Sequence, residues 1–340
     1  WTCGGAGLCA MAPPNPRCGA ALGIEGGRWL VTLAGYFGDR AGNDDASLLA
    51  FAREMPAPWI YELLQRAERL SEPIAATFSH SQRRRYERLE RFPRGLLALG
   101  DSIAFGYNPF GDFSKDKNFQ GYPEALRSEF SVKSSACPGE TSGSFLSNAA
   151  PDNGCRAFRG NYPLHVNYGS NATQMDYALS RVTSSEAEDV PTQITLNVSG
   201  NDIFLAQARC ATDPQGPAAC FAAGATALIT SIATNVATIL GTLRGAGYTG
   251  PITYMNLYAT DYSNPNTVGF LNALNGAVST QARNFGAKIA NAFGAFQAAA
   301  GSQSPCAAGL LIVKPDESGC DVHPSAAGTE VLAQSVRGAQ

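Results

Sequence analysis

A serine follows an apolar run of strand length in the first half of the chain. The run Leu96–Leu99 ends at Gly100, Asp101 and Ser102. Parallel strands of open α/β sheets present their reactive side chains at their carboxyl ends, where ligands bind, so a serine here could be a nucleophile. Gly-Asp-Ser is also ordinary turn chemistry, because glycine supplies a positive φ and Asp or Ser caps a helix. The tripeptide alone does not decide between the two roles.

Three polar turns downstream carry a glycine, an asparagine and a histidine. Gly139 lies in Cys-Pro-Gly-Glu-Thr after a short strand-like run, Asn201 lies in Ser-Gly-Asn-Asp after another, and His323 lies near the C-terminus in Asp-Val-His-Pro. Each turn has a structural explanation by itself, such as an Asx turn at Asn201. Their joint occurrence in this order favours a functional interpretation.

The four turns resemble the sequence blocks of the SGNH (GDSL) hydrolase family of secreted bacterial esterases and lipases. The resemblance spans about residues 93–340, and places the family's Ser, Gly, Asn and His at Ser102, Gly139, Asn201 and His323. It implies an α/β fold, a flavodoxin-like three-layer α/β/α sandwich with a parallel sheet.

The chemistry of each side chain agrees with this assignment. A serine hydroxyl needs a base to remove its proton, and His323 is the candidate. The side-chain NH₂ of Asn201 and the backbone N–H groups of Gly139 and Ser102 could hold the oxyanion of a tetrahedral intermediate. His80 lies in a charged stretch and His165 in a Tyr- and Asn-rich loop, so we expect neither to be catalytic.

The acid of a triad is where this sequence departs from the family pattern. The usual aspartate lies three residues before the histidine, a position that Cys320 occupies here. Either the side chain of Asp321 or the backbone carbonyl of Cys320 could orient the imidazole, the latter giving a Ser–His dyad as in some secreted members of the family. We expect the Cys320 carbonyl, and Asp316 is a poorer candidate.

Nine cysteines are more than a reduced cytosolic enzyme of this size usually carries. Three neighbouring pairs enclose Gly- and Pro-containing loops and are interpreted as disulfides: Cys137 with Cys155, Cys210 with Cys220, and Cys306 with Cys320. The absence of a Cys-x-x-Cys pair argues against a zinc site, while connectivity and a fully reduced set stay open. Cys3, Cys9 and Cys18 remain as an odd set. The resemblance agrees with the three bridges, which secreted family members often carry.

Composition limits the partners of the chain. A net charge of -3 gives no basic footprint, so we expect no nucleic-acid partner. No apolar stretch approaches the roughly 20 residues that span a bilayer, so we expect no transmembrane segment. A hydrophobic content of 44% is typical of a core-forming globular protein. The oligomeric state stays open, and the cysteines predict a secreted or periplasmic location.

Short apolar runs alternate with longer helical patterns, as a parallel sheet with crossover helices requires. The predicted strands cover residues 96–99, 131–136, 193–198, 251–257 and 288–293. The predicted helices cover residues 122–130, 175–182, 221–243, 268–285 and 324–336.

Residues 1–92 differ from the rest because their basic residues are all arginines. Two helical segments, 44–53 and 61–70, are separated by prolines, and an arginine- and glutamate-rich stretch, 80–91, favours a solvated helix over a nucleic-acid patch. We expect a mostly helical N-terminal extension of unknown role over residues 1–92, and a hydrolase domain over 93–340.

These features predict a serine esterase or lipase that acts through an acyl-serine intermediate on short- to medium-chain acyl esters, without metal or cofactor. Phe105, Tyr107 and Phe110 could line an acyl pocket or pack in the core. An acetyl-polysaccharide esterase is the enzymatic alternative. A secreted binding module that kept the scaffold and lost activity is the alternative from another class.

Overall fold

The chain divides into two compact units in a computed structural model that describes residues 7–8, 16–35, 38–55, 58–76, 94–186 and 189–339. The units comprise Trp1–Arg88 and Leu89–Gln340. The division, the boundary predicted at residue 92 and the predicted arginine-rich helix all lie outside the described residues. Each unit is described by itself below.

The N-terminal unit is a small antiparallel sheet packed against two helices. Its elements are β1 (Gly7–Leu8), β2 (Arg17–Ile24), β3 (Arg28–Gly35), α1 (Asp45–Arg53) and α2 (Pro58–Arg66).

The prediction of a mostly helical extension was wrong, because β2 and β3 pair along their full length. Glycine and alanine give β2 little intrinsic strand preference, so the local signal is weak. The strand is instead stabilised by helix packing: a Cβ on Gly19 would lie 2.7 Å from Met55 Cε and 2.9 Å from Ile60 Cδ1.

The second unit contains a five-stranded sheet in the order β5-β4-β6-β7-β8, with every pair parallel. The strands are β4 (Arg94–Gly100), β5 (Phe130–Ser134), β6 (Gln193–Asn197), β7 (Ile252–Met255) and β8 (Lys288–Ala290). After β4, the chain adds β5 on one side and then β6, β7 and β8 on the other, as in flavodoxin-like folds. Ligands of such sheets bind at this switch point between β4 and β6. The predicted fold class is confirmed.

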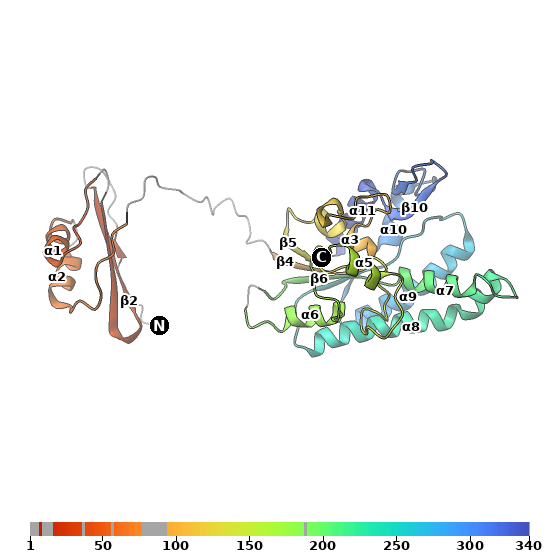
Figure 1. The fold of residues 1–340 in the computed structure, drawn as a ribbon, viewed down its shortest axis with the longest axis horizontal. Helices are drawn as coiled ribbons and strands as arrows, with labels where there is room; N and C mark the ends of the chain where they lie inside the picture. The colour runs from red at the N-terminus through yellow and green to blue at the C-terminus, as the bar shows by residue number, and fades with distance from the viewer. Residues whose placement is uncertain are drawn as a thin grey trace. The chain divides into compact units, whose positions relative to one another are not determined.

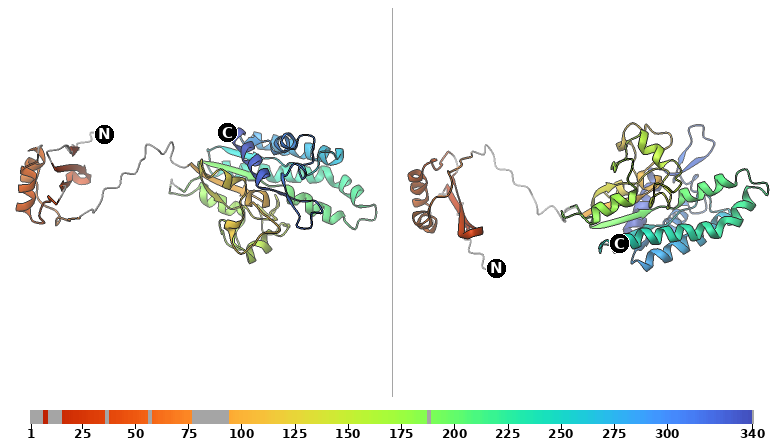
Figure 2. Two further views of the ribbon diagram at one scale, coloured as in Figure 1. Left: turned by 90° about the horizontal axis from the view of Figure 1, so that it is seen from above. Right: turned by 60° about the horizontal axis from the view of Figure 1, so that its bottom comes forward.

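Helices cover both faces of this sheet (Figures 1 and 2). One face packs against α6 (Gln174–Val182), α8 (Pro217–Gly245) and α9 (Pro265–Asn284). The other packs against α3 (Ser102–Phe105), α4 (Tyr122–Ala125), α10 (Ala292–Ala300) and α11 (Ala326–Ala339). The remaining elements are η1 (Glu25–Gly27), η3 (Asp116–Asn118), α5 (Cys155–Asn161), α7 (Gly200–Cys210), β9 (Leu311–Val313) and β10 (Cys320–Pro324).

Several predicted boundaries differ from the structure. The predicted helix 122–130 ends at Ala125, and β5 already begins at Phe130. Two further differences have clear local reasons. The predicted strand 288–293 ends at Ala290, because the Asn291 side chain accepts from Gly294 N and caps α10. The predicted last helix starts later, since Pro324 ends β10 and α11 begins at Ala326.

The helix α8 is long and apolar enough to cross a membrane by length and composition, contrary to the expectation of no such stretch. Its alanine-rich sequence raises mean hydropathy without a long run of large apolar residues. The second half of α8 is a core helix, because Val236, Ile239, Leu240 and Leu243 are buried against the sheet. One helix that passes a test of length and hydropathy is weak evidence for a membrane span, because a core helix passes the same test.

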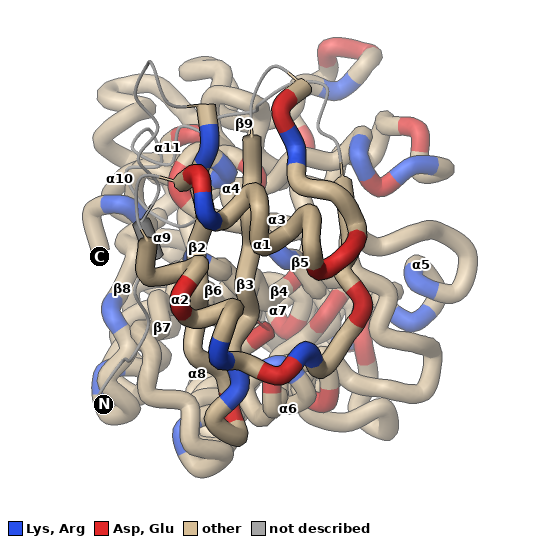
Figure 3. Tube along the Cα trace, turned by 90° about the vertical axis from the view of Figure 1, so that its left-hand side faces the viewer, with Lys and Arg blue, Asp and Glu red and all other residues tan. Residues whose placement is uncertain are grey.

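All three interpreted disulfides are present: Cys137–Cys155, Cys210–Cys220 and Cys306–Cys320. Cys18 lies in β2, whereas Cys3 and Cys9 lie outside the described residues. On the side shown in Figure 3, Lys and Arg are interspersed with Asp and Glu along the described trace. That distribution agrees with the lack of a basic footprint in the composition.

Candidate active site

The serine turn follows the end of β4 and is held by two local constraints. Gly100 has a φ of 147°, and a Cβ there would lie 2.1 Å from the Asn197 carbonyl oxygen, so only glycine fits. Asp101 then caps α3, since its Oδ1 accepts a hydrogen bond of 3.0 Å from Ile103 N. Ser102 is therefore the first residue of a helix and is partly exposed.

His323 lies next to Ser102 although 221 residues separate the two along the chain. Its Nε2 is 2.9 Å from Ser102 Oγ, a hydrogen-bond distance. The histidine is in β10, which pairs with β9 in a two-stranded antiparallel ribbon. The hydroxyl of Tyr258, a partly buried residue, donates to the Val322 carbonyl at 2.7 Å, which fixes the strand beside the histidine.

The other ring nitrogen of His323, Nδ1, contacts Asp321 Oδ1. The expectation that the Cys320 carbonyl would orient the ring is contradicted. The ladder of β9 and β10 is irregular between Cys320 and Pro324, and Asp321 Oδ1 also accepts from His323 N at 3.0 Å, which turns the carboxylate back toward the ring. Asp316 instead accepts from Ser318 in an exposed turn.

This pairing also affects the acid itself. Partial burial opposes ionisation of Asp321, but its hydrogen bonds with His323 and the charge of that histidine outweigh burial and lower the pKa of the carboxyl. Asp321 is thus an ionised group suited to stabilise an imidazolium.

Gly139 and Asn201 lie at the carboxyl ends of β5 and β6, on the same sheet edge as Ser102. Gly139 has a φ of 88°, and a Cβ there would lie 2.4 Å from the Asn153 carbonyl oxygen. In residues 94–186 and 189–339, no hydrogen-bond acceptor is recorded for the backbone N–H of Ser102 or Gly139. Both groups are available to an oxyanion.

The Asn201 side chain is buried and fixed from both ends. Its Nδ2 donates to the Glu140 carbonyl at 3.0 Å, and its Oδ1 accepts from Asn153 Nδ2 at 2.9 Å. One of its two side-chain N–H groups therefore remains for another acceptor. Asn153 is a functional candidate that the sequence did not reveal, because nothing local marks its contact with a residue 48 positions away.

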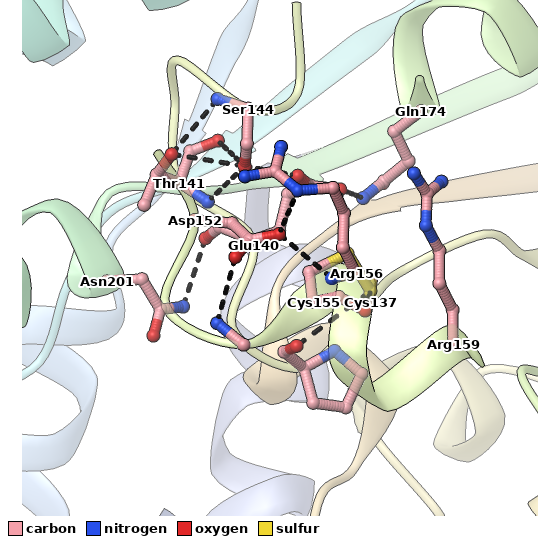
Figure 4. Close-up of a disulfide and its surroundings, with 12 residues drawn as sticks. Cys137, Glu140, Thr141, Ser144, Asp152, Cys155, Arg156, Arg159, Gln174 and Asn201 are labelled. Carbon is pink, nitrogen blue, oxygen red and sulfur yellow. Dashed lines mark hydrogen bonds and ion pairs between the residues drawn. A yellow bond between two sulfur atoms is a disulfide. The ribbon is translucent and has the colours of Figure 1, made fainter. Parts of the chain in front are cut away.

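A buried network connects the serine turn with the Gly139 loop, and Figure 4 shows its part around Glu140, Ser144 and Gln174. Gln174 Oε1 accepts from Gly100 N at 2.7 Å, and its Nε2 donates to Gly100 O and to Glu140 Oε2, both at 2.8 Å. Ser144 Oγ donates to the other oxygen of Glu140 at 2.5 Å. No sequence signal identified Gln174, since its role depends on the packing of α6 against the end of β4.

Carboxyl groups behind the serine are strongly desolvated. Burial raises the pKa of Asp101 to about 7, with a further contribution from the charges of Asp202 and Glu140. Burial also raises the pKa of Asp202 and of Glu140, although each accepts hydrogen bonds from serine. This side of the site therefore holds several acids away from solvent.

One cluster has the composition of a metal site but does not fit a metal ion. The sulfurs of Cys137 and Cys155 and an oxygen of Glu140 lie within 4.8 Å of one another. The two sulfurs form a disulfide, whereas metal binding requires thiolates.

His165 and Phe105 do not contribute side chains to the site formed by Ser102 and His323. His165 Nε2 lies 3.0 Å from the Phe105 carbonyl oxygen and its Nδ1 faces Asp116, so it fastens the loop after α3. Phe105 is fully buried in the core and does not line the site. His80 lies outside the described residues.

The fold is of the flavodoxin-like α/β class, with polar side chains gathered at the carboxyl edge of its parallel sheet. Residues 98–331 match the GDSL-like Lipase/Acylhydrolase family, and the chain belongs to this family. The predicted family is thereby confirmed over the second unit.

Individual similarities are more distant. The chain is 30% identical over 120 residues to "Protein Rv3254" of Mycobacterium tuberculosis (strain ATCC 25618 / H37Rv), covering 35% of this chain and 25% of that protein. Phospholipase A1 from Streptomyces albidoflavus NA297 is 18% identical with a TM-score of 0.46, covering 73% of this chain and 100% of that chain. Axe2, an acetylxylan esterase from Geobacillus stearothermophilus, is 15% identical with a TM-score of 0.43, covering 72% and 92%.

Proposed function

We propose that the chain hydrolyses carboxylic esters through an acyl-serine intermediate. The observation that carries the proposal is the chain of contacts from Ser102 Oγ to His323 Nε2, and from His323 Nδ1 to Asp321. A base within hydrogen-bond reach of a hydroxyl, itself oriented by a carboxylate, is the arrangement that activates a serine.

In the first half of the reaction, Ser102 Oγ attacks the ester carbonyl carbon while His323 Nε2 takes the hydroxyl proton. The resulting oxyanion accepts hydrogen bonds from the N–H groups of Ser102, Gly139 and Asn201. The intermediate then collapses, the C–O bond to the alcohol breaks, and His323 returns the proton to the leaving oxygen. In the second half, His323 deprotonates a water, which attacks the acyl-serine carbonyl carbon. The bond from that carbon to Ser102 Oγ then breaks, His323 returns the proton to Oγ, and the carboxylic acid leaves.

Short- to medium-chain acyl esters are the proposed substrates, and no metal or organic cofactor takes part. The three disulfides support a location in an oxidising compartment, outside the cell or in the periplasm.

Two measurements test this function. A fluorophosphonate should label Ser102 covalently, as read by peptide mapping, and Ser102→Ala should lose both labelling and hydrolysis of p-nitrophenyl acetate and butyrate. A label on a different serine would contradict the assignment. Wild-type hydrolysis no faster than that of Ser102→Ala would instead favour an inactive binding module.

A further inference from the structure

Four aromatic rings form a continuous surface that begins at the histidine of the site. Tyr107, Phe113, Phe158 and Tyr162 are called the aromatic strip below. The ring of Tyr107 packs edge-on against the ring of His323, with centroids 5.0 Å apart.

The rings of the strip contact one another in sequence from the histidine outward. Tyr107 stacks on Phe113 with centroids 5.5 Å apart and planes within 5°, and Phe113 contacts Tyr162 at 5.2 Å. Phe158 packs against each of the other three. The strip thus extends from the imidazole toward solvent without a charged side chain among its rings.

The rings of the aromatic strip are partly open to solvent, unlike the core rings below them. Phe105 and Phe119 lie beneath it and are fully buried, whereas Tyr107, Phe113 and Phe158 are partly exposed and Tyr162 is 41% exposed. Exposed aromatic surface next to reactive groups is typical of a binding wall, because large rings gain most from excluding water.

The strip is also held in place relative to the oxyanion donors. Phe158 is on α5, which starts at Cys155, and that cysteine is bonded to Cys137 in the loop that carries Gly139. Tyr107 and Phe113 lie in the loop that leaves α3, one turn after Ser102. The aromatic strip is therefore linked through Cys155 to the Gly139 loop and through the loop after α3 to Ser102.

We propose that the aromatic strip binds the alcohol moiety of the ester and selects apolar, ring-bearing alcohols. The inference rests on the proposed function, whose chemistry determines which part of the ester lies beside His323. His323 must return its proton to the leaving oxygen, so the group attached to that oxygen lies beside the imidazole. The acyl group is the remaining substituent of the tetrahedral carbon and points elsewhere.

The test compares three esters that vary one moiety at a time. Benzyl acetate and methyl acetate share the acyl group, whereas methyl acetate and methyl butyrate share the alcohol. In Tyr162→Ala and Phe113→Ala, kcat/KM for benzyl acetate should fall about three- to tenfold, the range for one lost aromatic contact. The values for both methyl esters should stay unchanged, and Tyr162→Phe should behave as wild type because the ring remains.

Phe110→Ala is the matched control, since Phe110 is 48% exposed in the same loop and has no recorded ring contact with the strip. A second readout follows the reverse of acylation, in which an added alcohol accepts the acyl group from the acyl-enzyme. Wild type should transfer acetyl to benzyl alcohol in preference to methanol, and Tyr162→Ala should lose that preference.

Three results would overturn the assignment of the strip. A selective change with methyl butyrate would place the acyl group there, an equal change with all esters would indicate a structural role, and no change would remove the strip from binding. In each case the wild type still hydrolyses esters. Wild type without any Ser102-dependent hydrolysis would reject the proposed function, and the strip assignment with it.

Discussion

The two walls of the site are built in different ways. The wall that carries the proposed oxyanion donors, called the oxyanion wall, consists of Gly139, Asn201 and the Glu140–Gln174 network, which are buried and bonded to the sheet edge. The histidine wall is the β9–β10 ribbon, in which Asp321 and His323 are only partly buried. Two fastenings of that ribbon are the Cys306–Cys320 disulfide and the hydrogen bond from Tyr258.

This difference fits the different tasks that we propose for the two walls. Donors that stabilise an oxyanion gain most from a fixed, water-excluded position, since they then need no reorganisation during the reaction. A proton-transferring imidazole must stay accessible to the leaving alcohol and to water. We therefore expect substitutions in the oxyanion wall to lower activity mainly by removing buried hydrogen-bond donors. Substitutions in the histidine wall should lower activity mainly by changing the orientation of the His323 ring.

The largest effect should come from the acid of the histidine wall. Asp321→Asn keeps the shape but removes the charge that selects the tautomer, so kcat should fall on the order of 10⁴-fold with little change in KM. Steady-state hydrolysis of p-nitrophenyl acetate measures this, with exposed Asp316→Asn as the neutral control. A near-normal kcat would return the role to the Cys320 carbonyl.

Next in size is the side-chain donor of the oxyanion wall. Asn201→Ala should lower kcat by about 10²- to 10³-fold, because one hydrogen bond to the oxyanion is lost while substrate binding is kept. Asn153→Ala should cost less, since Asn153 only holds the oxygen of Asn201. Equal losses in the two variants would mean that Asn201 acts through the loop and not on the oxyanion.

The disulfide of the histidine wall should affect stability and activity together. Replacing Cys306 and Cys320 by alanine should lower the free energy of unfolding by about 3 kcal/mol, as for a loop of this length. It should also lower kcat roughly tenfold by loosening the ribbon. Removal of Cys210–Cys220, a bridge of similar length between α7 and α8, should cost similar stability. If both double variants kept full activity, the bridge would not position the histidine.

The smallest effect concerns the buried acid between the walls. The pKa of Asp101 rises from 3.8 to about 7 on folding, so the folded protein binds more protons than the unfolded chain in that window. Stability therefore falls as pH rises from 3.8 to 7, and the neutral Asp101→Asn variant escapes this loss.

Relative to wild type, Asp101→Asn should gain about 2 to 3 kcal/mol between pH 5 and pH 7.5. Urea unfolding at the two pH values gives this difference. A constant difference would show that Asp101 is ionised at both.

The parallel strands along the chain and the polar turns that carry Ser102, Gly139 and Asn201 could be predicted, because both depend on local sequence. Apolar runs such as 193–198 mark buried parallel strands, and Ser102, Gly139 and Asn201 follow such runs. His323 instead lies within the antiparallel β9–β10 ribbon, which was not among the predicted strands. The N-terminal sheet was missed for the converse reason. Its strand β2 is rich in glycine and alanine, has little strand preference of its own, and packs at Gly19 against Met55 and Ile60.

The fold class, the turn of the candidate nucleophile and the candidate base could be inferred from local patterns, because strand patterning and turn chemistry are properties of neighbouring residues. The contact of Asp321 with His323, the hydrogen bonds of Gln174 with Gly100 and the packing of Tyr107 against His323 became visible only in the folded chain. These contacts join residues through backbone irregularities and packing across the sheet edge. No local preference encodes such directions, because they depend on how distant segments of the second unit pack against one another.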